Sequence, residues 1–202
     1  MPELLGSGAS PFVRKVRVLI AEAGIDDVPY TEVTASPMGG EDRINTANPL
    51  GKIPALLREE GPTIYDSNVI CRYLDDRAGA GLYPPARLWE VLTLEATADG
   101  MMEAAVGMIY EIRFRPEELW WQPWLEGQWT KVDRALDALE RSWLSHLSGP
   151  VDMGQIAVGC ALGYLDLRHG VRDWRKGRPG LSAWFADFSA RPSMVATAPP
   201  VA

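Results

Sequence analysis

Cysteine and histidine are scarce in this sequence, which contains two of each among 202 residues. Cys71 and Cys160 lie in helix-like apolar stretches without CxxC spacing, so we expect buried thiols rather than a disulfide. His146 and His169 are accompanied by no HExxH motif or Cys/His cluster. We therefore expect no metal site, and we expect His146 at the surface or as a helix C-terminal cap.

Long apolar runs and strongly basic tracts are also missing. No stretch approaches the roughly 20 apolar residues that a membrane span needs, and MPELLGSG lacks the basic and apolar regions of a signal peptide. The formal net charge is −7 and the main basic cluster is RKVR, so nucleic acid and anionic membranes are poor partners. We expect a soluble, cytoplasmic protein.

Apolar residues, by contrast, are plentiful. They make up 47% of the chain, which also contains 8 Trp, 19 Gly and 16 Pro. This composition is typical of a globular protein with one large domain or two small ones, and it excludes a disordered chain.

Residues 1–79 alternate between strand and helix patterns. Strands are predicted at 2–6, 28–33, 53–57 and 63–65. A helix is predicted from Pro11 to Gly24, with an apolar face of Phe12, Val16, Leu19 and Ala23. A second helix is predicted at 66–79, with an inner face of Val69, Ile70, Tyr73 and Leu74. The order is β-α-β followed by β-β-α.

Residues 88–202 show no convincing strand. Large apolar residues recur there at steps of three and four, on one helical face comprising Trp129, Val132, Leu136, Leu139, Trp143 and Leu147. Asp152 and Gln155 form a variant capping box ahead of another helix. We expect a first domain at 1–79, a linker rich in small residues and proline at 80–87, and an all-helical domain at 88–202.

Pro54 does not fit a plain strand, because it falls at the start of the apolar strand in NPLGKIPALL, where its missing N–H weakens the ladder. The pattern alone favours a trans proline at a sheet edge, since only about 5% of X–Pro bonds in folded proteins are cis. The alternative is a cis Ile53–Pro54 bond, which turns the Ile53 backbone outward to pair with an extended peptide ligand.

Several motifs together resemble the cytosolic glutathione S-transferases over nearly the whole chain. They are SPFVRKVR, NPLGKIPAL, YDSNVICRYL, the LYPP linker and the helix DMGQIAVGCALGYLDLR. Within that superfamily the chain is most similar to small bacterial members whose first helix opens with Ser-Pro-Phe. The resemblance implies an α/β thioredoxin-like N-terminal domain, an all-α C-terminal domain, a cis Pro54, a homodimer and a role in detoxification, with glutathione as co-substrate.

The resemblance also implies the glutathione-binding residues. Asp66 and Ser67 match the acidic residue and serine that hold the γ-glutamyl end, where a helix N-terminus suits the carboxylate and Asp66 can pair with the ammonium. Ile53 matches the residue whose backbone pairs with the cysteinyl part, and Lys52 matches one near the glycyl carboxylate. The implied set is completed by Phe12 and Pro54. A plain Asp-Ser helix cap and a solvated lysine are the alternatives that the residues themselves allow.

Ser10, directly before Pro11, is the candidate catalytic residue. Only about 3% of a thiol with a pKa near 8.5 is thiolate at neutral pH, and the thiolate is the nucleophile. A hydroxyl donor at a helix N-terminus stabilises that anion, and lowering the pKa by about two units takes about 2.7 kcal/mol. The alternative role for Ser10 is a simple N-cap.

The position of this serine departs from part of the family. Serine-type members often place the hydroxyl one residue earlier, which is Ala9 here, whereas Ser10 matches the cysteine of cysteine-type members. Serine cannot form a mixed disulfide with glutathione, which argues against thiol-disulfide exchange. Ser7 is a weaker candidate, and Arg14 either brings a cation near the sulfur or pairs on the surface.

The implied reaction is transfer of the glutathione thiolate to a small apolar electrophile in a cleft facing the helical domain. The predicted substrate-binding wall comprises Tyr110, Trp120, Trp121 and Trp124, although such residues at helical spacing also form cores. Two other functions stay open. One is a noncatalytic ligand- or partner-binding protein of the same fold, which Ala9 makes credible. The other is a glutathione-dependent isomerase, whose best-known members carry a Ser-Ser-Cys signature absent here.

Overall fold

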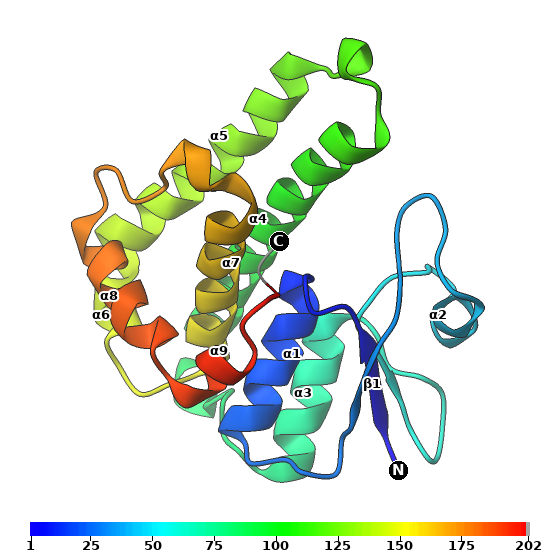
Figure 1. Ribbon diagram of the computed structural model, residues 1–202. Coiled ribbons are helices and arrows are strands. Elements are labelled where there is room, and N and C mark those ends of the chain that lie inside the picture. Colours follow the sequence, from blue (N-terminus) through cyan, green and yellow to red (C-terminus); the bar gives the residue numbers. More distant parts are fainter. Residues whose placement is uncertain (201–202) are drawn as a thin grey trace. The chain divides into compact units, whose positions relative to one another are not determined.

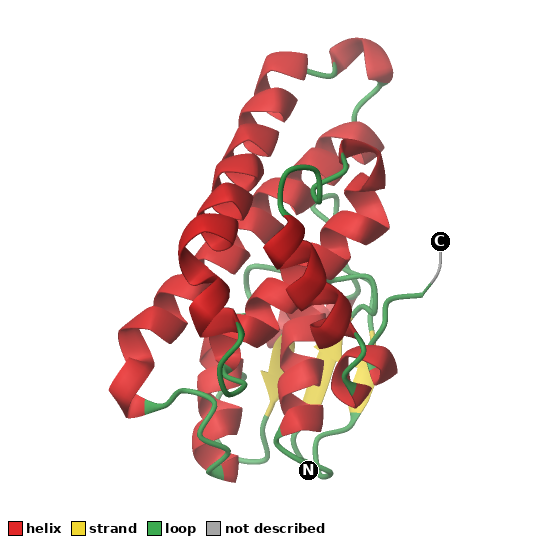
Figure 2. Ribbon diagram, turned by 90° about the vertical axis from the view of Figure 1, so that its left-hand side faces the viewer, coloured by secondary structure: helices red, strands yellow, loops and turns green. Residues whose placement is uncertain are grey.

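The computed structural model describes residues 1–200, which form two compact units. The first unit contains Met1–Arg87 and the segment from Pro192 onward, and the second contains Leu88–Arg191. Every strand described lies in the first unit, and the second is built from helices (Figure 1, Figure 2). The predicted combination of an α/β domain with an all-helical domain is confirmed.

The first unit is built on a three-stranded sheet with the order β2–β1–β3. Its strands are β1 (Glu3–Gly6), β2 (Tyr30–Glu32) and β3 (Ala55–Leu57). β2 runs parallel to β1, and β3 runs antiparallel to it. Its helices are α1 (Pro11–Glu22), α2 (Asp42–Ala47), α3 (Ser67–Ala78) and α9 (Pro192–Ala196), with a 3-10 turn at Pro85–Arg87.

The predicted fourth strand at 63–65 is reduced to a single bridge. Leu56 and Ile64 exchange two backbone hydrogen bonds, of 2.9 and 3.0 Å. Pro62 has no N–H with which to extend the pairing toward the preceding turn, and the chain enters α3 shortly after Ile64. The other three strands lie inside their predicted ranges.

Helices cover both faces of the sheet. α1 and α3 lie side by side on one face, and α2 lies on the other (Figure 1). The core on the α2 side comprises Leu5, Val33, Ile44, Ala47 and Ala55. Because helices cover both faces of the sheet, we expect a binding site in the loops that connect the strands to the helices.

α3 buries a different stripe from the predicted one. Ile70 and Leu74 are fully buried as expected, but Val69 is 51% exposed and Cys71 is buried in its place. Positions 67, 71 and 74 are separated by steps of four and three, so they share one helical face, whereas position 69 lies on another. Both cysteines are buried free thiols, as predicted.

The first unit contains two segments that lie outside the range 1–79 predicted for the first domain. The predicted linker at 80–87 lies inside this unit, where Leu82 is buried and its N–H donates to Asp75 Oδ1 at 2.8 Å. The segment from Pro192 onward also belongs to it, because α9 packs on α1 and buries Met194. Single apolar residues such as Leu82 and Met194, in short segments, show no helical or strand periodicity from which their burial in the first unit could be predicted.

Gly6 ends β1 at a point of close packing against α1. A Cβ atom at this position would lie 2.6 Å from both Cγ atoms of Val13. We expect Gly6→Ala to lower the free energy of unfolding by about 2 kcal/mol, because an overpacked site forces side chains or backbone to shift. Urea denaturation followed by circular dichroism measures the loss.

The matched control for this prediction is Gly100→Ala in the second unit. An added Cβ at Gly100 meets nothing within 4 Å. Since alanine favours helix over glycine, this change should be neutral or stabilising. Equal losses in the two variants would contradict steric overpacking at Gly6.

The second unit consists of helices and turns. Its elements are α4 (Leu88–Phe114), a 3-10 turn at Glu117–Leu119, α5 (Gln122–Ala138), a π-helical turn at Leu139–Trp143, α6 (Leu144–Leu147), α7 (Met153–His169), a 3-10 turn at Gly170–Arg172 and α8 (Pro179–Ser189). The predicted apolar face is confirmed in its aliphatic members, which are Val132, Leu136, Leu139 and Leu147. Trp129 and Trp143 on that face are only partly buried.

The predicted capping box at the start of α7 is confirmed. Asp152 Oδ1 accepts a hydrogen bond from the Gln155 N–H at 3.2 Å, and Gln155 Oε1 accepts one from the Asp152 N–H at 3.3 Å. His146 Nε2 lies 2.8 Å from Asp152 Oδ2, and the His146 side chain is only 10% exposed. His146 is therefore not at the surface, which is one of its two predicted positions, and the C-cap residue of α6 is Ser148 rather than His146, which lies in the last turn.

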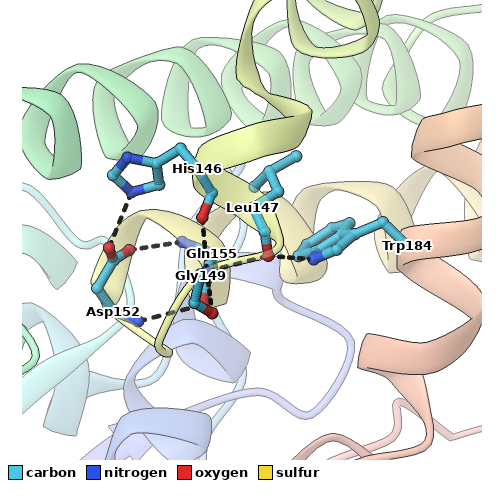
Figure 3. A network of polar contacts seen from close by, with 6 residues as sticks. All are labelled: His146, Leu147, Gly149, Asp152, Gln155 and Trp184. Carbon is cyan, nitrogen blue, oxygen red and sulfur yellow. Dashed lines mark hydrogen bonds and ion pairs between the residues drawn. The ribbon is translucent and has the colours of Figure 1, made fainter.

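Figure 3 shows that the capping box is the centre of a larger network. The Gln155 amide nitrogen lies within hydrogen-bond distance of the carbonyls of His146, Leu147 and Gly149, at 3.0, 3.0 and 3.2 Å. Trp184 Nε1 on α8 donates to the Leu147 carbonyl at 2.7 Å. One polar cluster thus joins the end of α6, the start of α7 and α8.

Candidate functional site

Three loops of the first unit meet at one edge of the sheet. α1 follows the carboxyl end of β1. β3 runs antiparallel to β1, with Ala55 opposite Leu5, so the residues before β3 lie at that same edge. Ile64 is antiparallel to β3, and the chain therefore runs there in the direction of β1 before entering α3. The starts of α1 and α3 and the approach to β3 are brought together.

Ser10 is the N-cap residue of α1. Its Oγ accepts a hydrogen bond from the Val13 N–H at 3.4 Å, and its backbone N–H donates to the Ser7 carbonyl at 2.9 Å. Ser10 is partly exposed, and its hydroxyl hydrogen has no acceptor among residues 1–200. The cap role is thus real, and it leaves the O–H group available to an anion at the helix N-terminus.

Asp66 and Ser67 begin α3 with different roles. Asp66 is exposed and is the N-cap residue, with Oδ1 accepting from the N–H groups of Asn68 and Val69 at 3.0 and 3.4 Å. Ser67 is only 3% exposed, and its hydroxyl makes no hydrogen bond within the described part of the chain. A serine hydroxyl without a partner at a helix start, beside an exposed carboxylate, suits a ligand that carries one carboxylate and one ammonium group.

The approach to β3 presents unpaired backbone groups. The Ile53–Pro54 peptide bond is cis, Pro54 is buried, and the Ile53 side chain packs against the core on the α2 side. Neither the N–H nor the C=O of Ile53 makes a hydrogen bond within residues 1–200. These two groups are free to pair with an extended peptide.

Lys52 is exposed beside this segment. Its carbonyl accepts a hydrogen bond from Asn48 Nδ2 at 2.8 Å, and Asn48 Oδ1 accepts one from the Leu50 N–H at 3.0 Å. Asn48 is only 2% exposed and so fixes the loop from inside. The Lys52 ammonium forms no ion pair with any residue that the structure describes, which leaves it available to an anion.

Two polar residues of this region escape sequence analysis. Lys15 is fully buried, and its Nζ donates to Asn68 Oδ1 at 2.5 Å, which ties α1 to the start of α3. Its spacing of four residues from both Pro11 and Leu19 is the signal that places it on the buried face. Glu32, at the end of β2, accepts a hydrogen bond from the Gly8 N–H in the loop before Ser10. No spacing or motif in the sequence indicates this contact, because a glutamate at the end of a strand is usually solvated.

Glu32 is held as a carboxylate by its neighbours. Partial burial raises the pKa of its carboxyl, but hydrogen bonds from Tyr30, Gly8 and Ser7 and the charge of Arg17 outweigh burial and leave the pKa below its ordinary value. Burial and the hydrogen bond to Glu32 raise the pKa of Tyr30. Glu32 is therefore ionised and Tyr30 protonated at neutral pH.

Arg14 is not a surface residue. It is 8% exposed, and its Nη2 donates to the Met194 carbonyl at 3.0 Å. Its buried Nε has no partner among residues 1–200. Arg14 thus fastens α9 to α1, and the structure brings its guanidinium to a backbone carbonyl rather than to a surface carboxylate.

The four aromatic residues predicted to bind a second substrate come from the end of α4, the start of α5 and the connection between these helices. Tyr110 is 40% exposed and Trp121 is 62% exposed, whereas Trp120 and Trp124 are partly buried. Trp124 packs against Gly107 of α4, where an added Cβ would lie 3.4 Å from its ring. Tyr110 and Trp121 are therefore accessible to a ligand rather than part of a buried core.

Two further searches cover the part of the chain that the structure describes. None of its helices is long and apolar enough to cross a membrane. No group of three His, Cys, Asp or Glu side chains is placed so that it could hold a metal ion, within residues 1–200.

Comparisons with known proteins agree with one another. Residues 9–77 match the family model "Glutathione S-transferase, N-terminal domain", and residues 122–187 match "Glutathione S-transferase, C-terminal domain". The chain is 33% identical over 205 residues to the "Uncharacterized GST-like protein YibF" of Escherichia coli (strain K12), covering 99% of this chain and 100% of that protein.

Solved structures give similar matches. A glutathione transferase family member from Pseudomonas fluorescens Pf-5, with bound glutathione, is 45% identical with a TM-score of 0.97, covering 100% of both chains. A glutathione S-transferase from Methylobacillus flagellatus KT, also with glutathione bound, is 38% identical with a TM-score of 0.89, covering 99% of this chain and 100% of that one. Both matches extend over the two units described above.

Proposed function

Because this chain belongs to the glutathione S-transferase family, we propose that it binds reduced glutathione and transfers the thiolate to an apolar electrophile. The observation that carries the proposal is the meeting, at one sheet edge, of the Ser10 hydroxyl, the unpaired Ile53 backbone and the Asp66–Ser67 start of α3. Two similar proteins that contain bound glutathione support it.

Each end of the tripeptide has a matching group in this arrangement. The γ-glutamyl carboxylate binds the N-terminus of α3 and the Ser67 hydroxyl, and its ammonium pairs with Asp66. The cysteinyl N–H and C=O pair with the Ile53 backbone as an added strand. The glycyl carboxylate lies near Lys52. The remaining proposed contacts are made by Phe12 and Pro54.

Ser10 activates the bound thiol. Its O–H donates a hydrogen bond to the sulfur, and the N-terminus of α1 adds a favourable field, so the thiol loses its proton to solvent more readily. The thiolate then attacks the electrophilic carbon, a carbon–sulfur bond forms, and the leaving group departs with its electron pair. Because the nucleophilic sulfur belongs to glutathione and attacks the electrophile directly, no covalent bond to the enzyme forms in this step.

The electrophile is proposed to contact the aromatic residues of the second unit, which are Tyr110, Trp120, Trp121 and Trp124. Aromatic side chains suit flat, apolar or halogenated substrates. We further propose a cytoplasmic homodimer of the small bacterial type with a Ser-Pro-Phe helix start, acting in detoxification. The bacterial origin of several similar proteins supports that subgroup.

Calorimetric titration with reduced glutathione tests the binding step. We expect the wild-type protein to bind in the micromolar to millimolar range, and Ser67→Ala to weaken binding about tenfold by removing a hydrogen bond to a charged group. Ser189→Ala, which removes an exposed hydroxyl bonded to the Ala186 carbonyl at 3.1 Å, is the matched control.

The outcomes separate the proposed function from its alternative. Absence of glutathione binding by the wild-type protein would contradict the proposal. Normal binding with no conjugation in a screen of electrophiles would favour a noncatalytic protein of the same fold, the function that Ala9 supports.

A further inference from the structure

The loop that carries Ser10 is fixed by a carboxylate from the neighbouring strand. The Gly8 N–H lies 3.0 Å from Glu32 Oε1 and 3.1 Å from Oε2. The Ser10 N–H closes a turn onto the Ser7 carbonyl at 2.9 Å, so Gly8 lies inside that turn. Glu32 is itself in register with Gly6, the last residue of β1. The carboxylate therefore ties the turn to the sheet on which α1 rests.

Glu32 has its own orienting groups. The Tyr30 hydroxyl on β2 donates to its Oε2, and the Arg17 guanidinium on α1 lies 4.6 Å from the centre of the Tyr30 ring. Arg17 and Tyr30 are the charged and titratable groups that face Glu32 from the elements beside it. Glu32 is an exposed residue, and these contacts hold its carboxylate in place as a hydrogen-bond acceptor.

We propose that Glu32 is a positioning residue for thiol activation: through the Gly8 N–H, its carboxylate holds the Ser7–Ser10 turn so that the Ser10 O–H stays at the N-terminus of α1. The inference rests on the proposed function, because the activated group is the thiol of bound glutathione. Glu32 touches neither the thiol nor the electrophile in this scheme and acts only through the turn.

Charge and positioning predict opposite effects for Glu32. A carboxylate near a thiolate disfavours that anion, so if charge alone mattered, removing Glu32 would lower the thiol pKa. If Glu32 positions the turn, removing it weakens the hydrogen bond from Ser10 and the thiol pKa rises. The direction of the change therefore distinguishes the two.

The test compares Glu32→Ala with Glu32→Gln by titrating the ultraviolet absorbance of bound thiolate against pH. We expect Glu32→Ala to raise the pKa of the bound thiol by about one unit and to lower turnover at mildly acidic pH about tenfold. Affinity for glutathione should change less than about twofold, because Ile53, Asp66 and Ser67 lie on other segments. Glutamine keeps the shape and one carbonyl acceptor for Gly8, so Glu32→Gln should restore most of the activity.

A second measurement needs no ligand. Hydrogen exchange of the Gly8 amide, followed by NMR, should be about tenfold faster in Glu32→Ala than in the wild-type protein and close to wild type in Glu32→Gln. The control is Glu140→Ala. Like Glu32, Glu140 binds backbone N–H groups through its carboxylate, accepting from Gly180 and Leu181 at 3.0 and 2.6 Å, but it lies in the second unit. This variant should alter neither Gly8 exchange nor the thiol pKa.

Three results would overturn the positioning role: unchanged Gly8 exchange in Glu32→Ala, a lowered thiol pKa in both variants, or an unshifted thiol pKa despite normal glutathione binding. The last of these leaves the proposed function intact. Failure of the wild-type protein to bind glutathione overturns both.

Discussion

Ser10→Ala is expected to lower the rate of glutathione conjugation about a hundredfold at mildly acidic pH, while glutathione affinity stays within about twofold. The Ser10 Oγ accepts only one long hydrogen bond, from Val13 at 3.4 Å, and its O–H is unclaimed by residues 1–200. Donation of that O–H to the sulfur favours the thiolate over the thiol. Loss of the Ser10 hydroxyl should therefore raise the pKa of the bound thiol, while the residues that bind the rest of glutathione are unchanged.

Steady-state kinetics with an aromatic halide, together with calorimetry, measure this effect. The kcat of Ser10→Ala should recover as the pH rises toward the pKa of free glutathione, because the thiolate then forms without help. Ser148→Ala is the control, since it removes an exposed helix-end hydroxyl that donates to the Leu144 carbonyl at 2.8 Å in the second unit. Loss of the N-cap costs about 1 kcal/mol of stability, so folding is checked by circular dichroism.

Two outcomes would reject this role for Ser10. One is wild-type kcat in Ser10→Ala across the pH range, which would leave Ser10 as a simple helix cap. The other is an equal loss of affinity and kcat, which would make it a binding residue instead.

Local signals account for the parts of this structure that could be predicted from the sequence. Ser10 before Pro11, and Asp152 three residues before Gln155, satisfy N–H groups within the same helical turn, so their spacing alone specifies both caps. The buried stripe of the second unit follows from steps of three and four for the same reason. Each of these features depends on residues within about two helical turns of one another.

Features that depend on distant partners could not be predicted in this way. Val69 is exposed because the elements that pack against α3 contact the other side of that helix. In the predicted strand at 63–65, only Ile64 pairs with β3, through Leu56. The role of Glu32 depends on parallel pairing of β2 with β1, which brings it to Gly8, 24 residues away in sequence. The glutathione contacts proposed above follow from matching motifs and stay predictions, whereas the supporting residues Lys15 and Glu32 are identified only from the fold.

Asp152→Ala is expected to be the most destabilising of the substitutions considered, lowering the free energy of unfolding of the second unit by about 3 kcal/mol. Asp152 is fully buried and performs two tasks, capping α7 through the Gln155 N–H and contacting His146 Nε2 at 2.8 Å (Figure 3). Alanine removes the cap and leaves a buried imidazole nitrogen without its partner. Each loss alone costs about 1 kcal/mol or more.

Tryptophan fluorescence during urea denaturation is the appropriate measurement, because all 8 Trp residues lie between positions 89 and 184, inside the second unit. Asp152→Asn keeps an acceptor for the Gln155 N–H and a polar partner for His146, and should recover part of the loss. The control is Glu126→Ala, which breaks an exposed pair with Arg172 at 2.6 Å and should change stability little. If Asp152→Ala and Glu126→Ala unfold at the same urea concentration, the buried network around Gln155 does not stabilise the second unit. Water must then replace the hydrogen bonds of Asp152 at no cost in stability.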